Sequence, residues 1–228
     1  LIEHLDELRK RIINCLLAVL ISSGISYIKV KDILHFLIKP LKHAVFISPM
    51  EVFGVYIKVA LCCGMVLASP IILFQIWQFV IVALTKSEKK YVALMLPPSL
   101  LFFLMGGAFA YFVIIPISIK FLLSFSTEYL TPMISINSYI SFIGILILAT
   151  GMVFELPIVI LFLNAIGIVS PKALRRNYKF VIVFIFIIAA VITPSPDIFT
   201  QILVGAPMLL LYEISIWLCH ISNSLRKK

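Results

Sequence analysis

Six long apolar segments constrain what this chain can fold into more than any other feature of its sequence. Charged or proline-rich stretches separate them, and they cover approximately residues 12–28, 52–84, 91–125, 140–168, 180–193 and 198–221. An apolar helix needs about 20 residues to cross the hydrocarbon core of a bilayer, and a helix satisfies its own backbone hydrogen bonds there. The segments therefore predict an all-α, polytopic membrane protein in which residues 1–228 form one domain with six transmembrane helices.

Two of these segments have unusual lengths. A helix over 91–125 would be roughly 50 Å long, so we expect it to tilt, or to kink at Pro97, Pro98 and Pro116. A helix over 180–193 would reach only about 21 Å, which is less than an ordinary hydrocarbon core of about 30 Å. We therefore expect the bilayer to thin beside that segment, or neighbouring helices to shelter its end.

The composition agrees with a membrane location and accounts for the positive charge. Hydrophobic residues make up 62% of the chain and charged residues 13%, whereas a soluble domain has about 45–50% and about 25%. Thirteen of the nineteen lysines and arginines fall at the two termini and in the loops after the second and fourth segments. Because basic residues gather in cytoplasmic loops, both termini are predicted to be cytoplasmic or stromal. The net charge of +9 then reflects topology, and no nucleic-acid partner is predicted.

The cysteines and histidines do not form a recognisable catalytic or metal-binding pattern. The four cysteines make no CxxC pair, no HExxH occurs, and the four histidines are scattered. Free cysteines in apolar runs behave as small hydrophobic residues. We therefore predict no metal site and no enzymatic activity.

Three acidic residues lie at or near membrane depth, where a charge costs about 2.5–3.5 kcal/mol. They are Glu155, Asp197 and Glu213. Glu155 shares a helical stripe with Gly144, Leu148 and Gly151, and the two glycines allow close helix contact or a shallow groove. Two interpretations remain open: Glu155 is protonated and hydrogen-bonded to a neighbouring helix, or it is a polar spot in a cavity that meets substrate or a partner.

The last segment begins and continues with polar residues. Asp197 is predicted to be its N-cap, with the carboxylate accepting from the backbone N–H of Thr200. Gln201, Gly205 and Glu213 fall on one side of a helix that Pro207 is expected to bend.

Acidic residues also occur among the cytoplasmic cations. Glu7 precedes the first segment, and Glu88 lies among lysines in the loop after the second segment. Either these carboxylates are solvated and paired with neighbours such as Arg9 and Lys10, or they bind a cationic peptide through charge-assisted hydrogen bonds.

Five motifs, in order along the chain, together resemble the TatC family, the multispanning core of the twin-arginine protein translocase. They are HLDELRKR (4–11), SPMEVF (48–53), FELP (154–157), ITPSPDIFTQ (192–201) and PMLLLYE (207–213). The resemblance implies a cupped six-helix fold with short fifth and sixth helices. It also implies that the chain binds signal peptides with paired arginines and, with single-span TatA- and TatB-like partners, exports folded proteins by using the proton-motive force.

The resemblance further implies the site residues. The signal-peptide site comprises Glu7, Leu8, Arg9, Phe79 and Glu88, and the positions for translocation or partner contact are Pro40, Glu155, Asp197, Gln201 and Glu213. Carboxylates suit paired arginines because each guanidinium can be held by two parallel hydrogen bonds, which lysine cannot copy. The predicted location is a bacterial plasma membrane, a plastid thylakoid membrane or another organellar membrane, and self-association within a receptor complex is expected.

One departure from the family pattern affects this site. The family usually has a proline, often followed by glycine, shortly before the first cytoplasmic loop, and the stretch 77–90 contains neither. The second helix is therefore expected to end later, which alters the placement of Glu88 relative to Glu7.

The competing functional hypothesis is a proton-coupled small-molecule transporter that uses Glu155 and Glu213 as its relay. Intramembrane carboxylates fit that mechanism equally well. The lack of a recognisable internal repeat and the exposed acidic pair favour the translocase instead.

Overall fold

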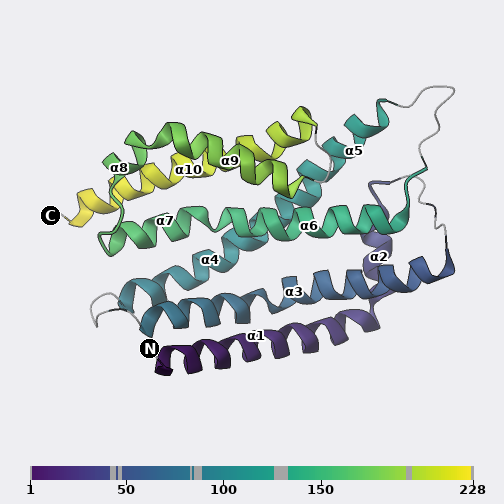
Figure 1. Cartoon of the computed structure of the whole chain (residues 1–228), viewed down its shortest axis with the longest axis horizontal. Coiled ribbons are helices and arrows are strands. Elements are labelled where there is room, and N and C mark those ends of the chain that lie inside the picture. The colour runs from purple at the N-terminus through teal and green to yellow at the C-terminus, as the bar shows by residue number, and fades with distance from the viewer. Residues whose placement is uncertain are drawn as a thin grey trace. The chain divides into compact units, whose positions relative to one another are not determined.

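The computed structural model describes residues 2–41, 45, 48–82, 84, 89–125, 133–193 and 197–226, and these residues are almost entirely helical (Figure 1). The elements are α1 (Ile2–Ile28), α2 (Val30–Ile38), α3 (Pro49–Val82), α4 (Lys89–Phe109), the π-helical turn η1 (Ala110–Ile114), α5 (Ile115–Leu123), α6 (Ile136–Phe154), α7 (Leu156–Ala165), α8 (Pro171–Arg176), α9 (Tyr178–Ile192) and α10 (Ile198–Arg226). Within the described ranges, the only β-type pairing is one isolated parallel bridge between Val45 and Ser135.

The helices confirm the prediction of an all-α chain with six apolar segments. Five helical stretches are long and apolar enough to cross a membrane: Asp6–Ile28, Met50–Ile81, Leu94–Leu123, Ile136–Ala165 and Ile198–Ser224. The remaining apolar helix, α9, has 15 residues. At about 1.5 Å per residue it reaches about 22 Å, so the fifth segment is short, as its sequence predicts.

The sixth helix differs from the expectation that it would be short. The helix α10 has 29 residues and contains Pro207 in its interior. Proline removes one backbone hydrogen bond and bends a helix without necessarily ending it. No glycine or proline follows Pro207 before Arg226, so the helix continues past its apolar part into the polar residues at its end.

The third apolar segment changes its helical geometry where a proline requires it. The elements α4, η1 and α5 follow one another without a break, and Pro97 and Pro98 lie inside α4. Immediately before Pro116, the amide of Ile115 donates to the carbonyl of Ala110, five residues earlier. Such π turns widen a helix locally, and this one lies where the ring of Pro116 conflicts with an ordinary α-helical ladder.

The fourth apolar segment is interrupted at Glu155, between α6 and α7. Pro157 is the second residue of α7, so it has no N–H to donate toward α6. Two residues before this proline, the amide of Glu155 donates to the carbonyl of Met152, three residues earlier, at 3.1 Å and not to a carbonyl four residues earlier as in an α-helix. The proline therefore creates a turn in the middle of a membrane-length helix, and the glutamate occupies that turn.

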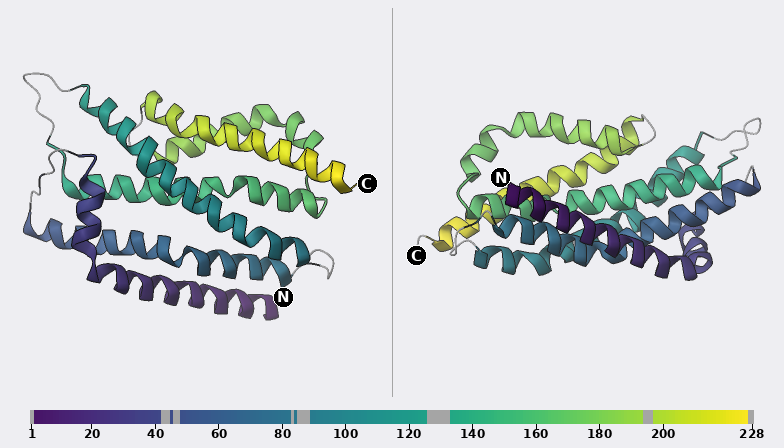
Figure 2. Two further views of the ribbon diagram at one scale, coloured as in Figure 1. Left: turned by 180° about the vertical axis from the view of Figure 1, so that it is seen from behind. Right: turned by 60° about the horizontal axis from the view of Figure 1, so that its bottom comes forward.

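The chain divides into two compact units, which are described separately. Unit 1 comprises Leu1–Ile76 and Gly107–Leu148, and unit 2 comprises Trp77–Gly106 and Ala149–Lys228. Within unit 1, α1 and α3 run side by side in both figures (Figures 1 and 2). Within unit 2, α10 packs against α7, α8 and α9.

Small residues bring the helices of unit 1 close together. A Cβ atom on Gly64 of α3 would collide with Ser23 of α1, and one on Gly144 of α6 would lie 2.6 Å from the Sγ of Cys62 in α3. The Gly144 contact shows that the glycine stripe of the fourth segment, predicted to allow either close helix contact or a shallow groove, makes a close helix contact here.

A polar cluster fastens the start of α6 to α3 in unit 1. The ammonium of Lys58 donates to Asn137 Oδ1 at 2.6 Å and to Ser141 Oγ at 2.9 Å. The carboxylate of Glu51 accepts from the hydroxyl of Ser135 and from the backbone N–H of Asn137. Lys58 lies inside an apolar helix, where its ammonium loses hydration. The oxygens of Asn137 and Ser141 compensate for part of that loss.

Candidate functional site

The helix break at Glu155 is the centre of a buried polar chain in unit 2. Ser99 Oγ of α4 donates to Glu155 Oε2 at 2.5 Å, and Trp77 Nε1 of α3 donates to Ser99 Oγ at 3.2 Å. Ser99 is fully buried, and Trp77 is 6% exposed. These two hydrogen bonds therefore connect the second, third and fourth apolar segments, and they end at the carboxylate of Glu155.

Close packing of α4 against α6 makes this hydrogen bond possible. A Cβ atom on Gly151 would lie 2.9 Å from a ring carbon of Phe103, and one on Gly106 would lie 2.7 Å from the backbone oxygen of Thr150. Larger residues at these positions would push the two helices apart, and the short side chain of Ser99 could then no longer reach Glu155.

The two carboxylate oxygens of Glu155 have different environments. Oε2 accepts from Ser99, whereas Oε1 is buried and has no hydrogen-bond partner among the described residues. Leaving a buried oxygen without a hydrogen bond costs free energy. Oε1 can lower that cost by carrying a proton or by accepting a hydrogen bond from another molecule. The structure confirms that Glu155 is hydrogen-bonded to a neighbouring helix; that it is protonated, and that it contacts substrate or a partner, both stay predictions.

Sequence reasoning missed Ser99. Its only signal is that it is a lone hydroxyl in an apolar run, directly after Pro97 and Pro98. A serine in a membrane-length helix can equally well bond to its own backbone, and its partner is 56 residues away.

The carboxylate of Glu7 already holds an arginine of its own chain. Arg11 donates from Nη2 to Glu7 Oε1 at 2.5 Å and from Nε at 3.2 Å, and its Nη1 donates to Gln75 Oε1 of α3 at 3.0 Å. The side chain of Glu7 is 27% exposed and that of Arg11 is 16% exposed. The interpretation that Glu7 pairs with a basic neighbour holds in kind, but the partner is Arg11, four residues along the same helix face, and not Arg9 or Lys10.

The other members of the implied signal-peptide site are placed only in part. Leu8 is 38% exposed and Arg9 is exposed on α1, while Phe79 is 36% exposed on α3 in unit 2. Glu88 lies outside the described residues. Whether these residues form one site therefore stays a prediction.

Asp197 caps the last helix, as predicted. Its Oδ1 accepts from the backbone N–H of Thr200 at 2.6 Å, and its Oδ2 accepts from the hydroxyl of the same residue. One turn later, Gln201 Nε2 donates to the backbone oxygen of Phe186 in α9 at 2.9 Å. Both polar side chains therefore fix the start of α10, and Gln201 also fastens it to α9.

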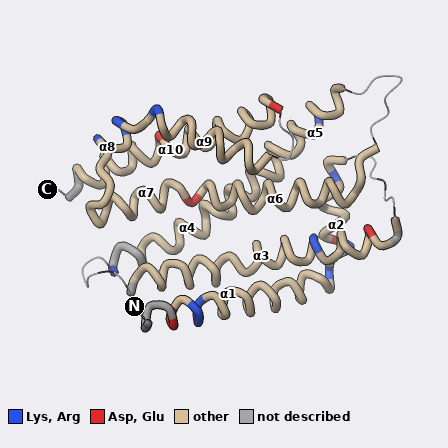
Figure 3. The backbone as a smooth tube through the Cα atoms, in the orientation of Figure 1, with Lys and Arg blue, Asp and Glu red and all other residues tan. Residues whose placement is uncertain are grey.

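Glu213 lies beside the basic loop between α7 and α9. Its carboxylate is 3.4 Å from Arg175 of α8, and the neighbouring Tyr212 donates its hydroxyl to the backbone oxygen of Leu174. Figure 3 shows the basic residues grouped on α8. The two charged side chains are 59% and 45% exposed, so this pairing does not favour Glu213 as a member of a buried proton relay.

Pro40, the remaining predicted residue, follows α2 and lines a cavity of about 700 Å³ in unit 1. Among the described residues, no group of three or more histidine, cysteine, aspartate or glutamate side chains could hold a metal ion. The described polar groups include one buried series of hydrogen bonds, from Trp77 through Ser99 to Glu155.

The chain is similar to proteins of one family. The family model described as "Sec-independent protein translocase protein (TatC)" matches residues 3–207. A Sec-independent protein translocase protein TatC from Carboxydothermus hydrogenoformans is 41% identical over 222 residues, which cover 96% of this chain and 91% of that protein. An uncharacterized tatC-like protein, ycf43, from Pyropia yezoensis is 37% identical over 212 residues, covering 92% and 84%. A crystal structure of the twin arginine translocase receptor TatC matches with a TM-score of 0.85 and 40% identity, over 96% of this chain and 99% of that one.

Proposed function

The chain belongs to the TatC family of Sec-independent protein translocase proteins, and on that premise we propose that it is a twin-arginine signal-peptide receptor. In this proposal it forms the core of a translocase that exports folded proteins, driven by the proton-motive force. The observation that carries the proposal is the similarity to the solved twin arginine translocase receptor over nearly the whole of both chains. No step requires a cofactor.

The proposed recognition begins at Glu7, with Leu8 and Arg9 beside it on α1. Phe79 and Glu88 complete the site. A guanidinium from the signal peptide forms short, charge-assisted hydrogen bonds with each carboxylate, and the planar fork of arginine makes two such bonds at once. Lysine offers a single point charge, so the site discriminates between the two residues.

Arg11 gives this recognition a competitor within the chain. Its Nη2 and Nε hydrogen bonds occupy Oε1 of Glu7, whereas its Nη1 is held separately by Gln75. An incoming guanidinium can therefore displace Arg11 from Glu7 while Arg11 keeps its bond to Gln75. The exchange replaces one arginine–carboxylate pair by another, while Arg11, whose side chain is 16% exposed, keeps the neutral amide oxygen of Gln75 as a hydrogen-bond partner.

Transport in this proposal also involves the second group of residues and further subunits. The oxygen of Glu155 that has no partner among the described residues accepts a hydrogen bond from a passing signal peptide or partner helix. Single-span TatA- and TatB-like proteins contact positions that include Pro40 in unit 1 and Asp197, Gln201 and Glu213 in unit 2, and the receptor self-associates. Relatives from a bacterium and of the ycf43 type support a bacterial plasma membrane or a plastid thylakoid membrane as the location.

Site-specific photocrosslinking tests signal-peptide binding. A photoreactive residue replaces Leu8, which is exposed next to Glu7 and leaves the carboxylate in place. The protein is offered signal peptides with Arg-Arg or Lys-Lys after the proton-motive force has been dissipated, so that only binding is measured. A photoreactive residue at Ile25, which is 59% exposed near the other end of α1, is the matched control.

We expect crosslinks from position 8 with the Arg-Arg peptide, few with the Lys-Lys peptide, and none from position 25. Equal crosslinking of the two peptides at position 8, or none with either, would contradict the proposal.

A further inference from the structure

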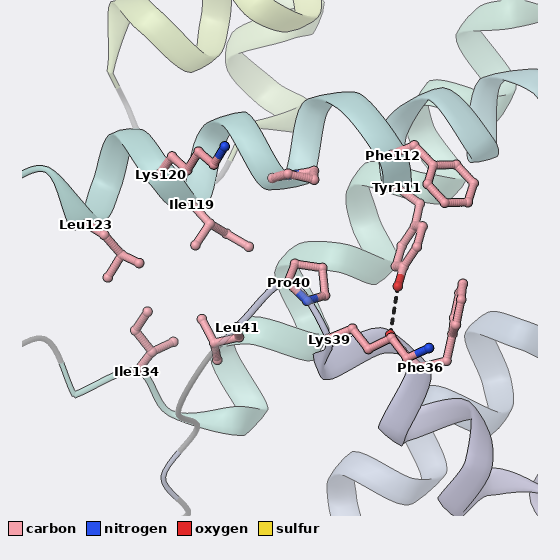
Figure 4. A pocket seen from close by; sticks show the side chains of 11 residues that line it. Phe36, Lys39, Pro40, Leu41, Tyr111, Phe112, Ile119, Lys120, Leu123 and Ile134 are labelled. Carbon is pink, nitrogen blue, oxygen red and sulfur yellow. Dashed lines mark hydrogen bonds between the residues drawn. The ribbon is translucent and has the colours of Figure 1, made fainter.

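The cavity beside Pro40 has two walls of different origin. One wall comes from α2 and the turn that follows it, and the other comes from η1 and α5. Figure 4 shows side chains from the two walls pointing toward one another, with Leu41 on one side and Ile119 on the other. A volume of about 700 Å³ lies within the range of about 300–1,000 Å³ that is usual for sites that bind small molecules.

The aromatic part of this cavity is held in place by its own contacts. The rings of Phe36 and Tyr111 stack with their centroids 4.7 Å apart, and the hydroxyl of Tyr111 donates to the backbone oxygen of Phe36 at 2.7 Å. This hydrogen bond links the two walls, and its acceptor is a backbone oxygen of α2. The cavity is therefore formed before any ligand binds.

Only two charged residues line the cavity, and both are positive. Lys39 follows α2, with its ammonium 5.6 Å from the centre of the Phe36 ring, and Lys120 belongs to the last turn of α5. The other nine of the eleven lining residues are aliphatic, aromatic or proline. Both lysines are exposed, and among the described residues neither has a carboxylate within ion-pair distance.

The cavity lies at one end of a membrane-length apolar stretch. Lys120 is three residues before the end of the span Leu94–Leu123, where long basic side chains extend their charge toward the lipid headgroups. Lys39 is on the turn after α2 and lines the same cavity as Tyr111, and tyrosine is enriched where a membrane meets water. An apolar cavity with a positive rim at this depth faces both acyl chains and phosphates.

We propose that this cavity binds one anionic phospholipid. Its phosphate forms ion pairs with Lys39 and Lys120 at the rim, and an acyl chain packs against Leu41, Tyr111 and Ile119. A zwitterionic lipid offers the same acyl chain and phosphate, but its cationic headgroup faces two lysines, so the site prefers the anionic lipid. The assignment is independent of signal-peptide recognition, because none of the proposed signal-peptide residues lines the cavity.

Native mass spectrometry of the full chain in detergent tests the proposal. The protein is titrated with phosphatidylglycerol or with phosphatidylcholine of the same acyl composition, and the ratio of the retained lipids is measured. We expect a preference of roughly 10- to 30-fold for phosphatidylglycerol, since each lysine near an anionic surface contributes several-fold. The double variant K39Q/K120Q should bring the ratio close to one, with an unchanged circular dichroism spectrum.

The double variant K29Q/K31Q is the matched control. It removes two exposed lysines from the same region, and neither residue lines the cavity. The preference should persist in this variant, and millimolar inorganic phosphate should not displace the lipid. Equal retention of both lipids by the unmodified chain would overturn the proposal, as would an equal loss of preference in both double variants. Displacement by inorganic phosphate would assign the lysines to a free anion instead.

Discussion

Glu7 and Glu155 are both carboxylates that the family resemblance marks as functional, yet the chain holds them in different ways. Glu7 is partly exposed near a helix end, and a charged residue four positions away occupies one of its oxygens. Glu155 lies in a proline-induced turn inside an apolar segment, and its partner is a neutral, fully buried hydroxyl. One carboxylate can exchange its partner through water, whereas the other is fixed by packing.

This difference indicates separate tasks for the two residues. A partly exposed ion pair four residues apart on one helix contributes little to stability, about 1 kcal/mol, so giving up Arg11 for another guanidinium is a small change for the fold. A buried carboxylate held by neutral donors depends on the fit of the helices around it. We therefore expect changes at Glu7 to affect binding more than stability, and changes around Glu155 to affect stability and transport together.

The largest effect is expected for Glu7→Gln. The substitution keeps the shape of the side chain but removes the charge that strengthens hydrogen bonds to a guanidinium, which are worth about 1.5–3 kcal/mol. Binding of the Arg-Arg signal peptide, measured by titration in detergent, should weaken about 10- to 100-fold, with little change in the melting temperature. Asp6→Asn, at the exposed acidic neighbour on α1, should leave the affinity nearly unchanged. A similar loss in both variants would show that only the overall charge of this region matters.

Ser99→Ala should have the largest effect on stability. It removes the one donor that Glu155 has in the polar chain and leaves Trp77 Nε1 without its acceptor, so the free energy of unfolding should fall by about 1–3 kcal/mol. Thermal unfolding followed by circular dichroism measures this loss. The control is Ser69→Ala, because Ser69 is also buried but bonds to the carbonyl of Val66 in its own helix. Equal destabilisation by the two substitutions would contradict the special role of the link to Glu155.

Substitutions of Glu155 separate packing from function. Glu155→Gln keeps an oxygen that accepts from Ser99, whereas Glu155→Ala removes it. If the second oxygen serves transport, both variants should lower export of a twin-arginine substrate, by about tenfold for a contribution of about 1.4 kcal/mol, and only Glu155→Ala should also be markedly less stable. Full export by both variants would reduce Glu155 to a packing residue.

The parts of the molecule that the sequence predicted are those decided by nearby residues. Six apolar segments and the short fifth helix follow from local hydropathy, and the Asp197 cap joins residues three positions apart. The turn at Glu155 also has a local cause, Pro157, although the sequence was interpreted there as one uninterrupted helix. The glycine stripe correctly indicated close packing but could not identify the partner helix.

The remaining features depend on which distant residues meet. Ser99 and Glu155 are 56 positions apart, and Lys58 and Asn137 are 79 apart. In each pair, one residue looks like an isolated polar side chain until the partner helix is known. The length of α10 was missed for a different reason: the family resemblance implied a short helix, while the residues after Pro207 contain nothing that ends one.

The smallest effect is expected for Arg11→Gln. This substitution tests most directly whether the partner of Glu7 can be exchanged while that of Glu155 is fixed. Removing Arg11 releases Glu7 from its internal partner, so the signal peptide no longer has to displace a guanidinium. Because a partly exposed pair four residues apart on one helix is worth about 1 kcal/mol, affinity for the Arg-Arg peptide should rise by no more than about fivefold, with little loss of stability. Lys10→Gln removes an adjacent exposed charge and should change affinity less. Weaker binding by Arg11→Gln alone would mean that Arg11 orients Glu7 rather than competing for it, and the carboxylate would then be as fixed as that of Glu155.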